Sequence, residues 1–266
     1  MLHSISWRNG RLAVPNLNEI AARLDEAARG ARAVPQLPEA LSLSDAYDVQ
    51  SKSMERRYDR GERRIGVKLG FTSRAKMIQM GVSDLIWGRL TDQMLAEAGS
   101  TLSRARFVHP RVEPEIAFLI KDPLEGRVDP MTAMAAVAGV APALEVIDSR
   151  YENFRFSVTD VVADNTSAAA IVIGPWSRPS TDVANLGMLL EIDGAPRQIG
   201  STAAILAHPI YALVAAARLV HMRGEQLSPG DIVMAGAATA AEGISANQFI
   251  KLSVEKLGSV SFVMGD

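Results

Sequence analysis

The chain has 266 residues, of which 48% are hydrophobic and 22% are charged, as in an ordinary globular protein. Its net charge of −2 leaves no basic face for nucleic acid, and the absence of cysteine excludes disulfides, thiolate metal sites and cysteine nucleophiles. The N-terminus lacks the apolar core of a signal peptide, and no apolar run reaches the roughly 18 residues of a membrane span. We therefore expect a cytoplasmic protein that binds neither nucleic acid nor membranes.

Residues 1–63 are predicted to form a small N-terminal helical region. Asn16, with a glutamate three residues later, has the pattern of a capping box, and apolar residues follow at helical spacing until Gly30. Ser44 is expected to begin a second helix, which Gly61 ends. The apolar stripe of both helices is typical of core packing.

Residues 64–266 alternate short strand patterns with turns and a few helices. Asp193-Gly194 is a strong hairpin signal between two of the strands. The expected helices are 72–80, a segment from Asp129-Pro130 to Gly139, and 208–222. The expected strands are 65–69, 112–120, 143–147, 169–173, 186–192, 232–235, 249–255 and 260–263. This order predicts an α+β fold with a large mixed sheet.

Three glutamates stand in predicted strands. Glu113 and Glu115 are two residues apart, so both side chains face the same side, and Glu145 lies within the apolar run ALEVI. Carboxylates buried close together are unfavourable without a cation, and oxygen ligands without cysteine favour Mg²⁺ or Mn²⁺. Spacing alone leaves a second interpretation, in which the first two glutamates face solvent and Glu145 pairs with an arginine.

Lys68 lies in the first predicted strand, between Val67 and Leu69. A partly buried lysine can serve as an acid or base, or it can form a salt bridge with one of the glutamates. The sequence has no P-loop, no G-x-G-x-x-G and no G-x-S-x-G motif. Nucleotide cofactors and serine hydrolysis therefore lack support.

Several segments together carry a family resemblance. In chain order they are GVKLGFTSRAKMIQMGV (66–82), HPRVEPEIAF (109–118), EVIDSRYENFRF (145–156), VVADNTS (161–167), LAHP (206–209) and GAATAA (236–241). Over about residues 44–263 the chain resembles the 2-oxopent-4-enoate hydratase and 4-oxalocrotonate decarboxylase family of the fumarylacetoacetate hydrolase superfamily. The resemblance implies a rolled, mixed β-sheet core with flanking helices. It also implies a catalytic domain over 64–266 in which Mg²⁺ or Mn²⁺ is held by Glu113, Glu115 and Glu145.

The resemblance also implies roles around a pocket for a small 2-oxo acid. It places Lys68 beside the substrate and Ser167 in the pocket wall. Thr239 lies in a loop that departs from the usual family pattern, and we expect it to shape the distal pocket. Arg150 is a candidate contact for a substrate carboxylate, with a structural ion pair to Asp148 or Glu152 as the alternative.

Decarboxylases and hydratases share this family, and three segments favour the decarboxylase. EVIDSRYENF and AKMIQMGV look like the decarboxylase versions, and Ile86 stands where hydratases tend to carry an aspartate. An apolar residue there suits loss of CO₂ from a poorly solvating site, although Ile86 also fits a role in the core. Our hypothesis is metal-dependent decarboxylation of 2-oxo-3-hexenedioate (4-oxalocrotonate) to 2-oxopent-4-enoate and CO₂ in aromatic catabolism.

Three alternatives remain open at this point. The chain could be a hydratase that adds water to 2-hydroxypenta-2,4-dienoate. Because the resemblance implies that such decarboxylases associate with their hydratase, the chain could instead be a stabilising subunit of that complex. A C–C hydrolase is less well supported, because no histidine lies next to the glutamates. We also expect a homo-oligomer.

Overall fold

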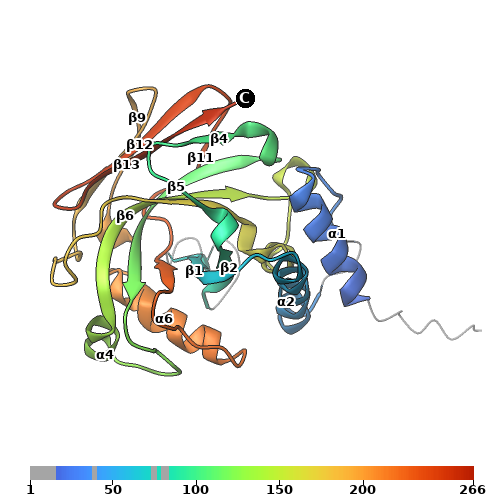
Figure 1. Cartoon of the computed structure of the whole chain (residues 1–266), viewed down its shortest axis with the longest axis horizontal. Coiled ribbons are helices and arrows are strands. Elements are labelled where there is room, and N and C mark those ends of the chain that lie inside the picture. The colour runs from blue at the N-terminus through green and yellow to red at the C-terminus, as the bar shows by residue number, and fades with distance from the viewer. Residues whose placement is uncertain (1–15, 38–40, 73–76, 79–83) are drawn as a thin grey trace, which may run out of the picture.

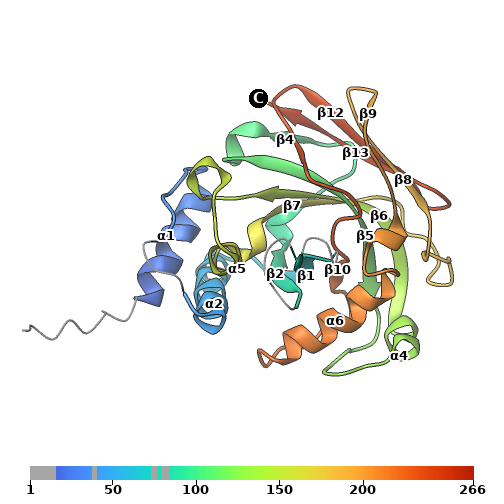
Figure 2. The ribbon, with the colours of Figure 1, turned by 180° about the vertical axis from the view of Figure 1, so that it is seen from behind.

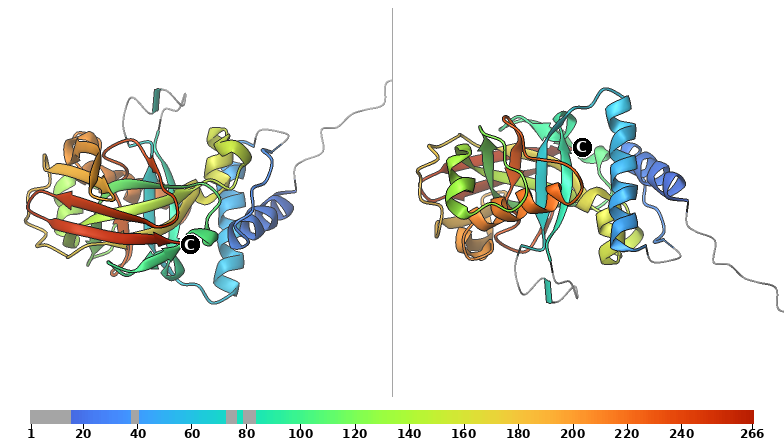
Figure 3. Two further views of the ribbon diagram at one scale, coloured as in Figure 1. Left: turned by 90° about the horizontal axis from the view of Figure 1, so that it is seen from above. Right: turned by 90° about the horizontal axis from the view of Figure 1, so that it is seen from below.

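The computed structural model describes residues 16–37, 41–72, 77–78 and 84–266. In these residues an eight-stranded sheet and a five-stranded sheet form the centre of the molecule. The smaller sheet packs over β6 and β7 of the larger one, α4 and α6 lie on the opposite side, and α1 and α2 stand together at one end (Figures 1 and 2). The views from above and below show the two N-terminal helices together at one end of the molecule, beside the sheets (Figure 3). The predicted helix 72–80 falls mostly outside the described residues.

The larger sheet has the strand order β2-β1-β10-β5-β6-β7-β3, with β11 paired to β5. It is mixed, because β1 runs parallel to β10 while β5 is antiparallel to β10 and to β6. The register of β5 and β6 sets Glu113 directly opposite Glu145. The strands are β1 (Arg64–Gly70), β2 (Ile86–Thr91), β3 (Leu95–Ala96), β5 (Pro110–Ile120), β6 (Val137–Asp148), β7 (Ala168–Ile173), β10 (Ile232–Met234) and β11 (Glu242–Gly243).

The smaller sheet is built mainly from two hairpins. The predicted turn between β8 and β9 is confirmed, and Asp193 and Gly194 have φ values of 54° and 73°, which a two-residue type I′ hairpin requires. The second predicted hairpin joins β12 and β13. The strands, in order across the sheet, are β4 (Thr101–Ser103), β13 (Gly258–Gly265), β12 (Gln248–Val254), β8 (Gly187–Ile192) and β9 (Ala195–Ser201).

The helices complete one hydrophobic core with the sheets. Leu24 and Val49, from the first two helices, are buried in the same cluster as the strand residues, and α5 packs beside α2 (Figure 2). The helices are α1 (Leu17–Arg29), α2 (Leu43–Asp59), α4 (Pro130–Ala135), α5 (Val158–Ala163) and α6 (Ile210–His221). None of the described helices is both long and apolar enough to cross a membrane. The division of the chain at residue 63 stays a prediction.

Two predicted helix boundaries were wrong. α2 begins at Leu43, because the side chain of Ser42, rather than Ser44, accepts the backbone N–H of Asp45 and caps the helix. α4 ends at Ala135 instead of continuing to Gly139, because the chain pairs with β5 as strand β6 from Val137 onward. Of the alanines that extend the helical pattern, Ala136 caps the helix and Ala138 already lies in the strand.

The two N-terminal helices are joined by a buried ion-pair cluster. Asp25 of α1 is 2% exposed, and its carboxylate accepts hydrogen bonds from Arg60 at 2.6 and 2.7 Å and from Arg56 at 3.0 Å. Burial raises the pKa of Asp25, but these arginines outweigh burial and hold the pKa below its usual value of 3.8.

We expect Asp25→Asn to lower the free energy of unfolding at pH 7 by about 2 kcal/mol, because a neutral amide at this buried position loses the charged hydrogen bonds to Arg56 and Arg60. A carboxyl with a lowered native pKa stabilises the fold above its unfolded pKa, and that contribution is lost as pH falls through the native value. Urea unfolding should therefore show a large difference from wild type at pH 7 that shrinks below about pH 4. An equal difference at both pH values would contradict this.

Candidate active site

Three carboxylates meet where β5 and β6 run side by side. Glu113 and Glu115 project from β5, and Glu145 projects from β6 opposite Glu113. One oxygen of each glutamate lies within 4.8 Å of one oxygen of the other two. Glu115 and Glu145 are completely buried. The structure thus brings together the three glutamates that the sequence singles out.

The environment of this cluster fits a divalent cation. Oε1 of Glu115 and Oε2 of Glu145 are buried without a hydrogen bond from any described residue. Oε1 of Glu145 lies 3.1 Å from Nζ of Lys68, and Oε2 of Glu115 accepts the N–H of Gly236 at 2.8 Å. Burial, together with the charges of Glu145 and Glu113, raises the pKa of Glu115 well above its usual value. Buried oxygens of this kind need a cation, and hard oxygen ligands suit Mg²⁺ or Mn²⁺.

Lys68 of β1 lies beside the carboxylates. Its Nζ is 3.1 Å from Oε1 of Glu145 and donates a hydrogen bond to the carbonyl of Thr166 at 3.1 Å. Burial opposes the charged ammonium, but the three glutamates outweigh it and raise the pKa of Lys68. The side chain therefore stays protonated. Both interpretations from the sequence fit this geometry, because Lys68 forms a salt bridge and also lines a cavity.

A cavity of about 920 Å³ opens in front of the cluster. Its walls combine polar groups with an apolar side that includes Ile86, Phe154 and Phe156. The residues predicted from the sequence that line it are Lys68, Ile86, Glu113, Ser167 and Thr239. Ile86 is 3% exposed, and the hydroxyl of Thr239 donates to the carbonyl of Ala240 at 3.2 Å.

The segment that carries Ser167 has an unusual backbone. Asn165, Thr166 and Ser167 have φ values of 50°, 52° and 58°, in the left-handed region that costs a non-glycine residue roughly 1–3 kcal/mol. Hydrogen bonds to β2 hold the segment in place, from Thr166 Oγ1 to the carbonyl of Trp87 and between Asn165 and the backbone of Arg89. The hydroxyl of Ser167 is buried and makes no hydrogen bond with the described residues. It is thus available to a bound molecule.

Gly88 of β2 allows this segment to come close, because a Cβ there would lie 2.5 Å from the carbonyl oxygen of Asn165. We expect Gly88→Ala to displace the segment and to lower the turnover number about 100-fold, as misplacement of a site by about 1 Å does. Magnesium binding should persist, since β5 and β6 are untouched. Gly243→Ala, where a Cβ meets nothing within 4 Å, is the matched control. Wild-type turnover in Gly88→Ala would contradict the assigned position of this segment.

Arg150 lies apart from the other predicted site residues. It is buried and is not among the described residues that line the cavity. Its Nε lies 2.6 Å from Asp164, and Nη2 donates to the carbonyl of the same residue at 2.7 Å. The expected contact of Arg150 with a substrate carboxylate is therefore not supported, and its ion-pair partner is neither Asp148 nor Glu152.

Arg111 is a cavity residue that the sequence interpretation missed. It lines the cavity two residues before Glu113, and its guanidinium lies 4.4 Å from the ring centre of Phe154. The signal was present in the sequence, because alternate residues of a strand share a face and Arg111, Glu113 and Glu115 alternate along β5.

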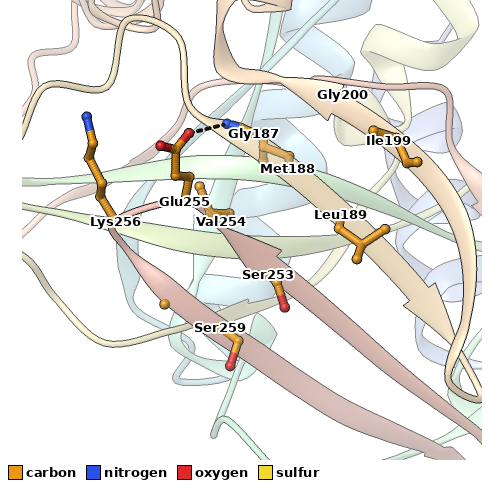
Figure 4. Close-up of a pocket in the computed structure, with 11 residues that line it drawn as sticks. Gly187, Met188, Leu189, Ile199, Gly200, Ser253, Val254, Glu255, Lys256 and Ser259 are labelled. Atoms are coloured by element: carbon orange, nitrogen blue, oxygen red, sulfur yellow. Dashed lines mark hydrogen bonds between the residues drawn. The ribbon is translucent and has the colours of Figure 1, made fainter.

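A separate depression lies on the smaller sheet, over β8, β12 and β13 (Figure 4). Its charged residues are Glu255 and Lys256, and Glu255 accepts the backbone N–H of Gly187 at 3.2 Å. It holds neither a cluster of carboxylates nor a buried lysine. Among the hollows lined by described residues, the cavity beside the glutamates is the better candidate for catalysis.

Comparison with known sequences agrees with this architecture. The sequence model of the Fumarylacetoacetate (FAA) hydrolase C-terminal family matches residues 66–263. The chain belongs to this family. The predicted α+β fold of the fumarylacetoacetate hydrolase superfamily is confirmed, and so is the resemblance from which it was inferred.

Within the fumarylacetoacetate hydrolase family, the chain is 52% identical to a 4-oxalocrotonate decarboxylase of a Pseudomonas species over 92% of its own length and 97% of the relative. It is 33% identical to the 2-hydroxyhexa-2,4-dienoate hydratase of Comamonas testosteroni over 90% of its length and 94% of the relative. The solved 4-oxalocrotonate decarboxylase from Pseudomonas putida G7, complexed with magnesium and adipate, superimposes with a TM-score of 0.90 and 35% identity. That match covers 93% of this chain and 97% of the other. Similarity is thus greater to the decarboxylase than to the hydratase.

Proposed function

We propose that this chain is a metal-dependent decarboxylase that converts 2-oxo-3-hexenedioate (4-oxalocrotonate) to 2-oxopent-4-enoate and CO₂. The observation that carries the proposal is the 52% identity to a named 4-oxalocrotonate decarboxylase over nearly the full length of both chains. The buried carboxylate cluster, with a lysine beside it and a cavity in front, supports the same chemistry. Mg²⁺ in a structurally similar decarboxylase supports Mg²⁺ as the cation here.

The reaction breaks the bond between the remote carboxylate and its neighbouring carbon. The electron pair of that bond moves through the conjugated chain to the 2-oxo oxygen, CO₂ leaves, and the dienolate takes up one proton. Glu113, Glu115 and Glu145 would hold the cation, which acts as a Lewis acid at the 2-oxo group when bound. Side chains of the cavity wall would bind the substrate, exclude water and supply the proton.

Lys68 supplies a permanent positive charge at the carboxylate end of the cavity. As an ammonium it can stabilise the negative charge of the dienolate or donate the proton. The apolar side, with Ile86, Phe154 and Phe156, solvates a departing carboxylate poorly and excludes water from the dienolate. This wall favours decarboxylation over hydration.

Arg111 is suited to the remote carboxylate of the substrate, because a guanidinium pairs with a carboxylate through two parallel hydrogen bonds. We expect Arg111→Gln to raise the KM for 2-oxo-3-hexenedioate about 10- to 100-fold, the loss of one charged hydrogen-bonded contact. Arg127→Gln, at an exposed arginine outside the cavity, is the control for the loss of a positive charge. Steady-state kinetics at saturating Mg²⁺ measure both. An unchanged KM in Arg111→Gln would remove this arginine from substrate binding.

Two substrates separate the decarboxylase from the hydratase. The purified protein with Mg²⁺ should release one CO₂ for each 2-oxo-3-hexenedioate consumed. It should leave the diene absorbance of 2-hydroxypenta-2,4-dienoate unchanged. Loss of the diene absorbance without CO₂ release from the first substrate would identify a hydratase. Inactivity of the isolated chain, with activity only after addition of a hydratase, would favour the subunit alternative.

The substrate in this proposal is a small 2-oxo acid. The remaining expectations concern location and assembly. A cytoplasmic location, a homo-oligomer and a complex with the pathway hydratase stay predictions.

A further inference from the structure

A second cavity, of about 240 Å³, lies between the C-terminal ends of α1 and α2, the end of β6 and the beginning of β7. It shares no lining residue with the active-site cavity. The neighbouring residues Ile147 and Asp148 of β6 line different cavities, because successive side chains of a strand point to opposite faces. Figure 1 shows α1 and α2 beside each other at this end of the molecule. A molecule bound here would not touch the carboxylate cluster.

The lining of this second cavity has an excess of positive charge. It contains more arginines than acidic residues, namely Arg29, Arg57, Arg60, Arg106 and Arg150 against Asp25, Glu62 and Asp148. Arg150 is balanced by Asp164, which lies outside the lining, and each of the three lining carboxylates already has hydrogen-bond partners. Both oxygens of Asp148 accept the backbone N–H of Val108, at 2.9 and 3.1 Å, and Glu62 accepts the hydroxyl of Thr91 at 2.6 Å. Asp25 is occupied by Arg56 and Arg60, as described above.

Arg57 is the arginine whose donors remain unsatisfied. Its side chain is 15% exposed, and its Nε is buried without a hydrogen-bond partner among the described residues. The nearest carboxylate oxygens are 3.8 Å away on Asp25 and 3.9 Å away on Glu62, beyond hydrogen-bonding distance. Burial and the charge of Arg150 lower the pKa of Arg57. A buried guanidinium in this position would be stabilised by an anion.

Two further arginines stand at the opening. Arg29 and Arg106 are exposed and line the same cavity. Arg106 donates one long hydrogen bond, 3.4 Å, to the carbonyl of Gln93. The side chain of Arg29 makes no hydrogen bond or ion pair with any described residue. Both can turn toward a bound anion without breaking an existing ion pair.

We propose that this second cavity is a binding site for a small oxyanion, either free phosphate or the carboxylate of a small organic acid, held by Arg57 with Arg29 and Arg106 at the opening. A guanidinium pairs with both groups through two parallel hydrogen bonds. Such a ligand would bridge α1, α2 and the segment before β5 that carries Arg106, three parts of the chain that otherwise meet around an excess of positive charge. It would therefore stabilise the folded protein.

The test is thermal unfolding of the full-length protein in EDTA, titrated with sodium phosphate or, separately, sodium acetate, with chloride keeping the ionic strength constant. We expect the unfolding temperature of the wild type to rise and saturate with at least one anion, because a ligand of the native state stabilises it by mass action. Arg29→Gln should raise the half-saturating concentration about tenfold, and Arg57→Gln should abolish the rise. Arg32→Gln, an exposed arginine near the end of α1 but outside the cavity, should behave as wild type. The anion that saturates at lower concentration identifies the source.

Three results would overturn the proposal. The first is the absence of a saturable rise in unfolding temperature with either anion in the wild type. The second is the same half-saturating concentration in Arg29→Gln, Arg32→Gln and wild type. Arg29→Gln decides the matter even if Arg57→Gln fails to fold, since the Arg29 side chain is exposed. The third is a sedimentation profile in which wild type self-associates, Arg57→Gln dissociates, and neither anion has an effect. That profile would make the cavity a contact between copies of the chain.

Discussion

Replacing Glu115 with glutamine should lower kcat/KM for decarboxylation about a thousandfold, equivalent to about 4 kcal/mol of transition-state stabilisation. Glutamine keeps an oxygen that can accept the N–H of Gly236, so the hydrogen bond at 2.8 Å is preserved and only the charge is lost. The metal-free variant should be at least as stable as metal-free wild type, because one of three mutually repelling buried carboxylates has been neutralised. CO₂ release and thermal unfolding, each with and without Mg²⁺, measure the two effects.

The combination of these effects separates a metal site from a merely structural cluster. Magnesium should raise the unfolding temperature of the wild type but not of Glu115→Gln, since a ligand that binds only the native state stabilises it. Glu97→Gln removes an exposed glutamate far from the cluster and should match wild type in both assays. A Glu115→Gln variant that keeps wild-type activity and the magnesium response would show that this carboxylate does not hold the cation.

Lys68→Met should lower kcat by about two to four orders of magnitude, the range lost when a positioned proton donor is removed. Methionine fills a similar volume but carries neither the charge nor the proton, and so it cannot stabilise the dienolate. The magnesium-dependent rise in unfolding temperature should persist, because the three glutamates are intact. Single-turnover kinetics at saturating Mg²⁺ measure the chemical step separately from cation binding.

A purely structural role for Lys68 predicts a different pattern. If the lysine only balanced the charge of Glu145, 3.1 Å away, saturating Mg²⁺ would replace it and Lys68→Met would regain nearly wild-type kcat. The control is Lys251→Met, on the smaller sheet, where Lys251 lies 3.9 Å from Glu191 at the surface. Its activity should be unchanged.

The sequence predicted those elements whose pattern is regular. Strands β8, β12 and β13 alternate buried and accessible residues, and the turn residues of the two hairpins mark their ends. β2 was missed as a strand because all six of its residues are buried, so it has no alternation to detect. α4 was predicted too long because alanine is compatible with a helix and also with the interior of a sheet.

The candidate site could be predicted only in part. The alternation of Glu113 and Glu115 places both on one face, but the pairing of β5 with β6 that brings in Glu145 depends on a register between distant segments. The left-handed backbone of Asn165–Ser167 could not be predicted, because the segment contains no glycine. The ion-pair partner of Arg150 was assigned to Asp148 or Glu152 because both are close in sequence, whereas its partner Asp164 lies 14 residues away along the chain. Arg111 was recoverable from the same alternation and was overlooked.

The measurement that tests the account most directly is CO₂ release from 2-oxo-3-hexenedioate by protein stripped of metal with EDTA and then titrated with Mg²⁺. We expect no enzymatic CO₂ release from the stripped protein and recovery that saturates at one magnesium per chain. Glu113→Gln should fail to recover at the same magnesium concentrations. Equal CO₂ release before and after addition of Mg²⁺ would contradict a metal-dependent decarboxylase built on these three glutamates.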